Sequence, residues 1–190
     1  MTIIMGVSGD KGSFSEEAAF LYAAQKAISP TFHYLIDMAG VLSAIERGDI
    51  NFGILPVVNL QGGLVKPAFQ AMGKYLFQPI DELWLHVRQC LLALPGVTKQ
   101  QIKNIVSHPQ GLAQCKDYIQ KEFTGVVLHE WINTAKAARD LSEGIFSADT
   151  AVIAPKRAAE LYGLDILATN IEDSSSNLTA FIVVKNREGL

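Results

Sequence analysis

Short apolar runs alternate with helical periodicity along the whole chain. From Met38 to Ile45, apolar residues recur at i, i+3, i+4 and i+7, which predicts a helix capped by Asp37 and ended by Gly48. Further helices are predicted over 15–28, from Pro109, from Asn133 and from Pro155 to Gly163. Apolar runs predict strands at 2–7, 50–57, 83–94, 104–107, 125–128, 151–154, 166–169 and 179–184. Strands that alternate with helices are typical of α/β proteins, so the pattern predicts two small α/β lobes with mainly parallel sheets flanking a ligand cleft.

Composition narrows the class of protein. Of 190 residues, 49% are apolar and 18% are charged, which excludes disordered chains and coiled coils. Sixteen Lys and Arg residues stand against nineteen Asp and Glu and form no basic cluster, so we expect no nucleic-acid partner. The chain shows no apolar run that could span a bilayer and no secretory leader pattern. We therefore expect no membrane partner and a cytoplasmic protein, with Cys90 and Cys115 as free thiols.

A glycine-rich turn joins the first predicted strand to the first predicted helix. Gly6, Gly9 and Gly12 are spaced G-x-x-G-x-x-G, which is neither the dinucleotide-binding fingerprint nor a P-loop. Three serine hydroxyls lie in or beside this turn, at Ser8, Ser13 and Ser15. Free backbone N–H groups at the positive end of a helix bind carboxylates or phosphates, so the turn predicts an anion site. A capped turn without a ligand is the alternative.

Polar residues also open other predicted helices directly after strands. Ser107 and His108 precede Pro109, and Asn133 follows the strand at 125–128. Ligands of open α/β sheets bind at the carboxyl ends of the strands, so we expect a small anionic ligand with more than one negative group. Among the histidines, His108 is the candidate for a role at the site, because it lies next to a predicted helix start. The alternative is a loop histidine that only forms structural hydrogen bonds. The four histidines share no metal-ligand spacing with a cysteine or a carboxylate pair, so we expect no metal site.

Four blocks of sequence occur in the order of the motifs of a known enzyme family. Residues 9–15 (GDKGSFS) resemble its G-P-x-G-[TS]-[FY]-S, and residues 107–115 (SHPQGLAQC) resemble its S-H-P-Q-A-L-A-Q-C. Residues 151–164 (AVIA followed by AAELYGL) are similar to A-A-I-A…A-A-x-x-Y-G-L, and residues 171–181 (IED…NLTAF) to I-x-D…N-x-T-R-F. On these blocks, which cover nearly the whole chain, the protein is identified as a member of the prephenate dehydratase family.

This resemblance implies an enzyme that converts prephenate, a small anionic cyclohexadienyl dicarboxylate, into phenylpyruvate, carbon dioxide and water in L-phenylalanine biosynthesis. It implies a homodimer and no cofactor, because aromatisation of the ring drives the reaction. The expected lobes are formed roughly by 1–75 with 150–190 and by 76–149, in an architecture like that of periplasmic binding proteins. The sequence ends nine residues after Phe181, so the family's phenylalanine-sensing domain and its feedback are expected to be absent.

The resemblance also implies roles for individual residues. Thr179 would be catalytic, with its hydroxyl beside the leaving water, although a β-branched residue that starts a strand is the alternative. The residues implied to bind and shape the substrate are Ser8, Gly12, Ser13, Ser15, Asn59, Ser107, Asn177 and Phe181.

Four motif positions depart from the family pattern. The family's P-[IV]-E-N-S reads PVVNL here, so Val58 and Leu60 replace a glutamate and a serine. Gln89 replaces a histidine, and Ala180 replaces the arginine of T-R-F. A lost arginine forfeits about 1.5–3 kcal/mol of charge-assisted hydrogen bonding to a carboxylate. The alternatives are therefore a paralogue with altered chemistry, such as an arogenate dehydratase or a prephenate decarboxylase, or a non-catalytic small-molecule binding protein.

Overall fold

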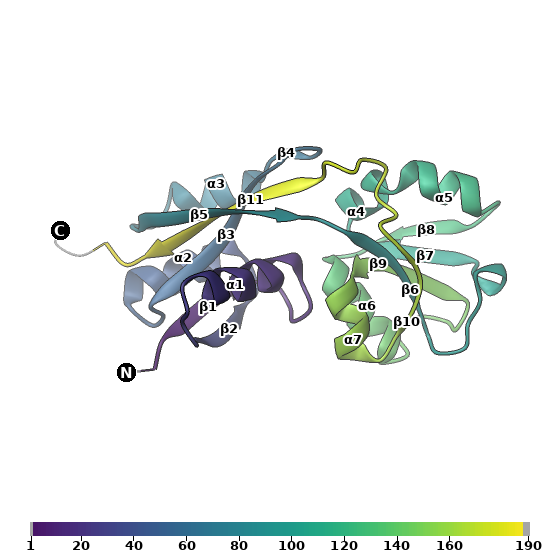
Figure 1. Cartoon of the computed structure of the whole chain (residues 1–190), viewed down its shortest axis with the longest axis horizontal. Helices are drawn as coiled ribbons and strands as arrows, with labels where there is room; N and C mark the ends of the chain where they lie inside the picture. The colour runs from purple at the N-terminus through teal and green to yellow at the C-terminus, as the bar shows by residue number, and fades with distance from the viewer. Residues whose placement is uncertain (1, 188–190) are drawn as a thin grey trace. The chain divides into compact units, whose positions relative to one another are not determined.

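The computed structural model describes residues 2–187 and divides them into two compact units (Figure 1). Unit 1 contains 2–86 and 178–187, and unit 2 contains 87–177. The boundaries expected from the sequence differ from these, since they place residues 76–86 in the second lobe and residues 150–177 in the first. Sheet pairing explains the difference: residues 78–86 pair with the last strand of unit 1, and residues 150–169 complete the sheet of unit 2.

Unit 1 is a six-stranded sheet with helices on its faces. Its strands run in the order β2-β1-β3-β11-β5, and β4 pairs with β3. The strands are β1 (Ile4–Ser8), β2 (Thr31–Leu35), β3 (Phe52–Asn59), β4 (Gly63–Leu64), β5 (Gln78–His86) and β11 (Leu178–Lys185). The helices are α1 (Phe14–Gln25), α2 (Met38–Arg47) and α3 (Lys66–Met72). As predicted, the Asp37 side chain caps α2 and Gly48 ends it in the left-handed region at φ 76°.

Unit 2 is a five-stranded sheet in the order β10-β6-β9-β7-β8. Its strands are β6 (Gln89–Ala93), β7 (Asn104–Ser107), β8 (Val127–Glu130), β9 (Thr150–Pro155) and β10 (Asp165–Thr169). Its helices are α4 (Pro109–Gln114), α5 (Lys116–Glu122), α6 (Thr134–Ser142) and α7 (Lys156–Tyr162), with a 3₁₀ turn η1 at Lys99–Gln101. The predicted cap of α6 by Asn133 and its end before Gly144 are confirmed.

Both sheets are mixed, which corrects the expectation of mainly parallel sheets. β1 is parallel to β2 and β3, and β7 is parallel to β8 and β9. β11 is antiparallel to β3 and β5, and β6 is antiparallel to β9 and β10. The chain leaves unit 1 after β5 and returns directly into β11, so these neighbours in the sheet have no crossover helix between them within the unit.

The predicted strand at 83–94 is two strands. β5 ends at His86 in the sheet of unit 1, and β6 begins at Gln89 in the sheet of unit 2. The alternation of apolar and polar residues from Leu85 to Arg88 crosses the end of β5, and alternation alone does not report a change of sheet. In addition, the helix expected from Pro109 breaks at Cys115 into α4 and α5, and β2 and α3 were not predicted.

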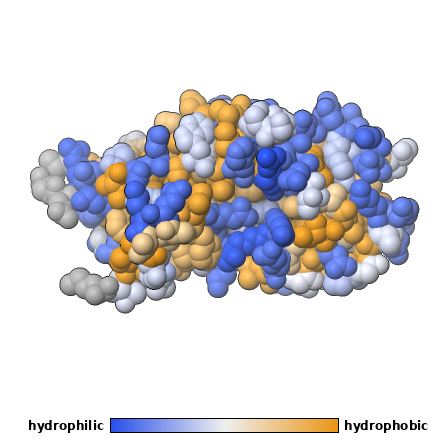
Figure 2. Space-filling model, in the orientation of Figure 1, coloured by the Kyte–Doolittle hydropathy of each residue, from blue (hydrophilic) through white to orange (hydrophobic). Residues whose placement is uncertain are grey.

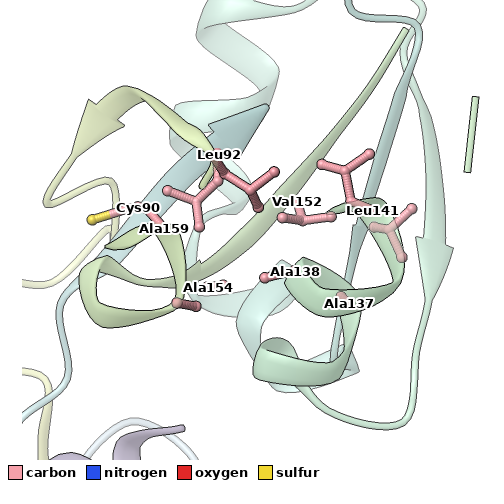
Figure 3. Close-up of a cluster of buried hydrophobic side chains, with 11 residues drawn as sticks. Cys90, Leu92, Ala137, Ala138, Leu141, Val152, Ala154 and Ala159 are labelled. Carbon is pink, nitrogen blue, oxygen red and sulfur yellow. The ribbon is translucent and has the colours of Figure 1, made fainter. Parts of the chain in front are cut away.

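The central strands of each sheet pack against apolar clusters on both faces. In unit 2, apolar side chains of β6 and β9, among them Leu92 and Val152, pack against Ala138 and Leu141 of α6 and Ala159 of α7 (Figure 3). Small residues on these helices allow close approach to the sheet, and each buried leucine or valine contributes about 1.5–3 kcal/mol of transfer free energy. No helix among the described residues has the length and apolar character needed to cross a membrane.

Candidate active site

Polar residues of unit 1 gather at the edge of the sheet where its parallel strands end. Ser8 is the last residue of β1, and Asn59 is the last residue of β3. Because β11 is antiparallel to β3, its first residues lie at the same edge, and Thr179 pairs with Asn59. Ligands of open α/β sheets bind at this edge.

Asn59 and Thr179 are joined by a hydrogen bond between side chains. Asn59 Nδ2 donates to Thr179 Oγ1 at 2.9 Å, and the two residues are 4% and 7% exposed. The remaining polar atoms of the Asn59 side chain hold the turn after β3, since Oδ1 accepts from the N–H groups of Gln61 and Gly62. Asn59 Nδ2 also contacts the main-chain carbonyl of Leu178 at 3.2 Å. The asparagine is therefore a fixed donor that orients the threonine hydroxyl.

This arrangement prepares the threonine hydroxyl to donate. Thr179 Oγ1 accepts from Asn59, so the hydrogen of the hydroxyl is left to donate to a different acceptor. Such a hydroxyl can donate to a leaving oxygen, which is the chemistry expected of Thr179. Phe181 lies two residues further along β11 on the same face, but it is 1% exposed and packs within the core of unit 1. In this structure the Phe181 side chain therefore stabilises β11 by packing in the core of unit 1.

The glycine-rich turn holds an acidic side chain at its centre. Gly9 and Gly12 have φ values of 94° and 81°, so both turn residues adopt the left-handed region that favours glycine. Glu16 is 1% exposed, and its carboxylate accepts from the Gly12 N–H at 2.8 Å and from the Tyr34 hydroxyl. The Gly12 N–H expected to bind a substrate carboxylate is thus bonded to the protein's own carboxylate, whose charge opposes a second anion.

The three serines of this region have different surroundings. Ser13 caps α1 by accepting from the Glu16 N–H at 3.3 Å. The hydroxyls of Ser8 and Ser15 lie 3.3 Å apart, and both residues are buried. Helix capping therefore accounts for Ser13, which agrees with the alternative of a capped turn without a ligand. Ser8 and Ser15 instead form a pair of hydroxyls at the carboxyl end of β1.

Two of the four departures from the family pattern lie opposite one another. Ala180 pairs with Val58 across the β11–β3 ladder and with Trp84 across the β11–β5 ladder. Neighbouring residues of a strand point to opposite faces, so the Ala180 side chain stands on the face away from Thr179. An arginine at this position would begin on the far face of the sheet, directly across from a glutamate at position 58. The Cβ of Ala180 therefore lies on the other face of β11 from the Thr179 side chain, and the loss of a carboxylate anchor stays a prediction.

Apolar residues surround this pair on the surface of unit 1. Leu64 pairs with Val58 and is 64% exposed, and Leu60 and Trp84 are also exposed. Figure 2 shows apolar residues where Figure 1 draws β4 and β11. The replacements at Val58, Leu60 and Ala180 therefore extend one apolar row over β4, β3, β11 and β5.

Unit 2 has its own group of polar residues at the corresponding edge of its sheet. Gln89, the first residue of β6, pairs with Pro155 at the end of β9, and Ser107 ends β7. Ser107 is completely buried, and its hydroxyl donates to the main-chain carbonyl of Ile153 at 2.7 Å. A Cβ at position 111 would lie 2.7 Å from Ser107 Oγ, so the glycine there leaves room for the serine. Ser107 therefore joins β7 to β9 and does not present its hydroxyl at the surface.

Three side-chain amides form a chain of hydrogen bonds in unit 2. Gln89 Nε2 donates to Gln114 Oε1 at 3.2 Å, and Gln114 Nε2 donates to Asn177 Oδ1 at 3.4 Å. Beside them, the buried Glu172 carboxylate accepts from Arg88 Nη1 at 2.8 Å and from the Gln89 N–H at 2.9 Å. These bonds hold the start of β6 and connect it to Asn177.

His108 lies at the start of α4. Its Nδ1 accepts from the Gln110 N–H at 3.2 Å, as a hydrogen-bonded loop histidine does. Burial lowers the pKa of His108, and the nearby Glu130 only partly offsets this. A neutral imidazole at this helix start agrees with the acceptor role of Nδ1. No cluster of three or more His, Cys, Asp or Glu side chains suited to a metal occurs among residues 2–187.

The structure therefore brings some of the predicted site residues into contact with one another. It joins Asn59 to Thr179 and Ser8 to Ser15, and it links Asn177 to Gln114. Sequence reasoning missed Glu16, Gln114 and Glu172. Two of them carried a signal, since Ser13 and Glu16 match the S-x-x-E capping pattern and Gln114 matches a residue of the S-H-P-Q-A-L-A-Q-C block, whereas Glu172 lies at a variable position of I-x-D.

Comparison with known proteins supports the same family over almost the whole chain. The family model described as prephenate dehydratase matches residues 5–189. Arogenate dehydratase 1 of Petunia hybrida is 36% identical over 183 residues, which are 96% of this chain and 42% of that protein. Arogenate dehydratase/prephenate dehydratase 6 of Arabidopsis thaliana, a chloroplastic protein, is 35% identical over 93% of this chain and 41% of its own length. The chain thus spans about two fifths of these relatives.

Solved structures show the same architecture. The prephenate dehydratase of Arthrobacter aurescens, solved in complex with L-Phe, superposes with a TM-score of 0.89 at 25% identity, over 99% of this chain and 62% of that one. A protein described as a quorum quenching acylase has a TM-score of 0.82 at 27% identity, over 98% and 65%. The lipoprotein Tp32 of Treponema pallidum shares the fold at a TM-score of 0.52 and 16% identity, over 98% and 84%. Related folds thus carry different activities, and it is the family model and the two dehydratases that show where this chain belongs: it is a member of the prephenate dehydratase family.

Proposed function

We propose that the protein is a dehydratase that converts a cyclohexadienyl dicarboxylate, prephenate or arogenate, into an aromatic product with release of carbon dioxide and water. The hydrogen bond from Asn59 to Thr179 Oγ1 is the observation that carries this proposal, because it leaves the threonine hydrogen for the leaving hydroxyl. The family membership and the names of the dehydratase relatives support the reaction class.

The chemistry is a coupled loss of two groups. The C–O bond to the ring hydroxyl breaks while Thr179 donates a hydrogen bond to the departing oxygen, and a proton from solvent completes the water molecule. The C–C bond to the ring carboxylate breaks with it, carbon dioxide leaves, and the electron pair of that bond enters the ring. Aromatisation supplies the driving force, so the step calls for no oxidant or reductant.

Retention of the Asn59–Thr179 pair favours a dehydratase over the other readings of the sequence. A decarboxylase that stops before aromatisation, or a receptor without catalysis, has no use for a hydroxyl oriented toward a leaving group. The departures at Val58 and Ala180 do not count against turnover, since they lie on the face away from Thr179.

Replacing Thr179 tests the proposal. We expect the unmodified chain to form phenylpyruvate from prephenate or phenylalanine from arogenate, and Thr179→Val to lower kcat by about 10²–10⁴-fold. Thr179→Ser, which keeps the hydroxyl, should retain most of the activity. Loss of the ring carboxylate without an aromatic product would indicate a decarboxylase instead. Tight binding of both compounds without any turnover would indicate a receptor.

We extend the proposal to the setting of the enzyme: a homodimer in a reducing compartment, the cytoplasm. Cys90 and Cys115 are buried and form no disulfide among the described residues, and burial raises the pKa of Cys115, so neither thiol is set up for reactivity. The Arabidopsis relative is chloroplastic, so cell fractionation is the test of the cytoplasm. Analytical ultracentrifugation tests the dimer, and a monomer at micromolar concentration would contradict it.

A further inference from the structure

One face of the unit 1 sheet carries a row of apolar side chains that ends in an exposed residue on each side. Leu64 of β4, Val58 of β3, Ala180 of β11 and Trp84 of β5 are direct partners in successive ladders, so their side chains lie on the same face. Leu64 is 64% exposed and Trp84 is 46% exposed, whereas Val58 is half-buried and Ala180 is buried. The row therefore has two large exposed side chains at its ends and two smaller side chains between them.

The two middle positions of this row are apolar in this chain and charged in the family pattern. That pattern has a glutamate where Val58 stands and an arginine where Ala180 stands. Burying such charges against another protein carries a large desolvation penalty, which valine and alanine do not incur. Large apolar side chains grouped on a surface are typical of protein–protein contacts, and tryptophan is among the residues that contribute most to binding. The replacements thus turn this face into a surface that can be buried.

Polar residues flank Trp84 along β5. Glu82 precedes it by two residues and His86 follows it by two, so both side chains lie on the face of the row, and both are exposed. An imidazole N–H donates hydrogen bonds to a carboxylate. When two copies of this sheet stack face to face with their β5 strands antiparallel, Trp84 of one copy packs on Trp84 of the other, and each Glu82 lies opposite His86 of the other copy. The surface is therefore complementary to itself, as a two-fold dimer requires.

The distribution of residue types on this face is that of a dimer interface. Specific interfaces bury about 800 Å² on each partner and have an apolar centre, rich in aromatic residues, inside a polar rim. Here Leu64 and Trp84 supply the centre of the surface. Glu82, His86 and the exposed Lys66, which follows β4, supply a polar rim.

We propose that unit 1 binds a second copy of the chain through the row formed by Leu64, Val58, Ala180 and Trp84, with the two β5 strands antiparallel. This inference rests on the homodimer of the proposed function and names the surface that forms it. Neighbouring residues of β11 point to opposite faces, so the dimer contact lies on the face of the sheet away from the Thr179 side chain.

Sedimentation of the whole chain tests the surface. We expect the unmodified chain to be a dimer at micromolar concentration. Trp84→Lys should raise the dissociation constant of the dimer by about 30-fold or more, because it removes the central aromatic pair and brings two cations together. Leu64→Lys should act in the same direction, and it decides the question if Trp84→Lys does not fold in circular dichroism melts. The matched control is Leu161→Lys on α7 of unit 2, at a residue that is 42% exposed, which should leave the dimer unchanged.

Exchange of the flanking charges tests the antiparallel arrangement. His86→Glu opposes two carboxylates at two symmetric places, so the dissociation constant should rise about 2–30-fold. Adding Glu82→Lys restores opposite charges across the contact and should return the dissociation constant to that of the unmodified chain. A double variant that dimerises no better than His86→Glu alone would overturn the arrangement.

The remaining outcomes separate this contact from the proposed function. A monomeric unmodified chain would overturn both the homodimer and the contact, and would leave the row to a partner of another sequence. A dimer that survives Trp84→Lys and Leu64→Lys would keep the homodimer and overturn the contact. Turnover is assayed on the same samples: a dimer that Trp84→Lys dissociates but that turns over neither prephenate nor arogenate would contradict the dehydratase and support the contact.

Discussion

The two units of the protein hold their polar residues at a sheet edge by different means. In unit 1, Asn59 and Thr179 are 120 residues apart in the chain and are placed opposite one another by the backbone ladder between β3 and β11. In unit 2, side-chain hydrogen bonds of 3.2–3.4 Å connect Gln89 to Gln114 and Gln114 to Asn177. Many backbone hydrogen bonds determine where a residue lies in a strand ladder. A series of side-chain hydrogen bonds, in contrast, is broken when any one of its residues is replaced.

The difference teaches where sequence change is tolerated. The pair in unit 1 keeps the family residues, and the changes beside it, at Val58 and Ala180, fall on the opposite face of the same strands. In unit 2 the change at Gln89 falls within the polar group itself. We therefore expect reaction chemistry to depend on the Asn59–Thr179 pair of unit 1, and the variants below test the comparison.

Among the three variants that follow, the one that removes Asn59 should have the largest effect. Asn59→Ala deletes the donor to Thr179 and both bonds that order the turn after β3, so we expect kcat to fall about 10²-fold and the free energy of unfolding to fall by about 2–4 kcal/mol. Urea unfolding and steady-state turnover measure the two effects. Asn51→Ala, which removes one exposed bond to the Ile4 N–H, is the control. An unchanged kcat in the destabilised variant would limit Asn59 to a structural role.

Restoring the charged family pair at positions 58 and 180 tests whether the side chain at position 180 lies on the face of the sheet away from Thr179. Ala180→Arg alone should lower the free energy of unfolding by about 1–3 kcal/mol, because the position is 6% exposed and offers no carboxylate partner across the strand. Adding Val58→Glu should recover about 0.2–1 kcal/mol as a cross-strand ion pair. A double-mutant cycle in urea measures the coupling. If Ala180→Arg alone instead lowered KM, an arginine there would reach the substrate, and the face argument would be wrong.

The smallest expected effect concerns the pH dependence of stability. The pKa of His108 is lowered in the folded protein, so the unfolded chain binds a proton more readily at this site. His108 therefore contributes stability above its unfolded pKa of about 6.5, and this contribution is lost as the pH falls. We expect His108→Gln to lose less stability than the unmodified chain between pH 7 and pH 5, as measured by thermal melts. Parallel curves for the two proteins would contradict a buried neutral imidazole.

Local signals in the sequence predicted much of the secondary structure but not its assembly. Asp37 and Gly48 mark the ends of α2 because capping and the left-handed turn are decided within a few residues. The strand predicted at 83–94 shows the limit, since its two halves belong to different sheets and nothing within the run marks the change at Val87. Pairing partners lie far away in the chain, and local pattern carries no information about them.

By itself, the sequence determined the α/β class, the family, and Asn59 and Thr179 as candidate site residues, because motif residues and periodicity are local properties. Only the tertiary structure decided that Asn59 orients Thr179, that Glu16 occupies the Gly12 N–H, and that Ala180 faces away from the candidate catalytic hydroxyl. Each of these depends on strand register or burial, which arise when residues distant in the chain are brought together.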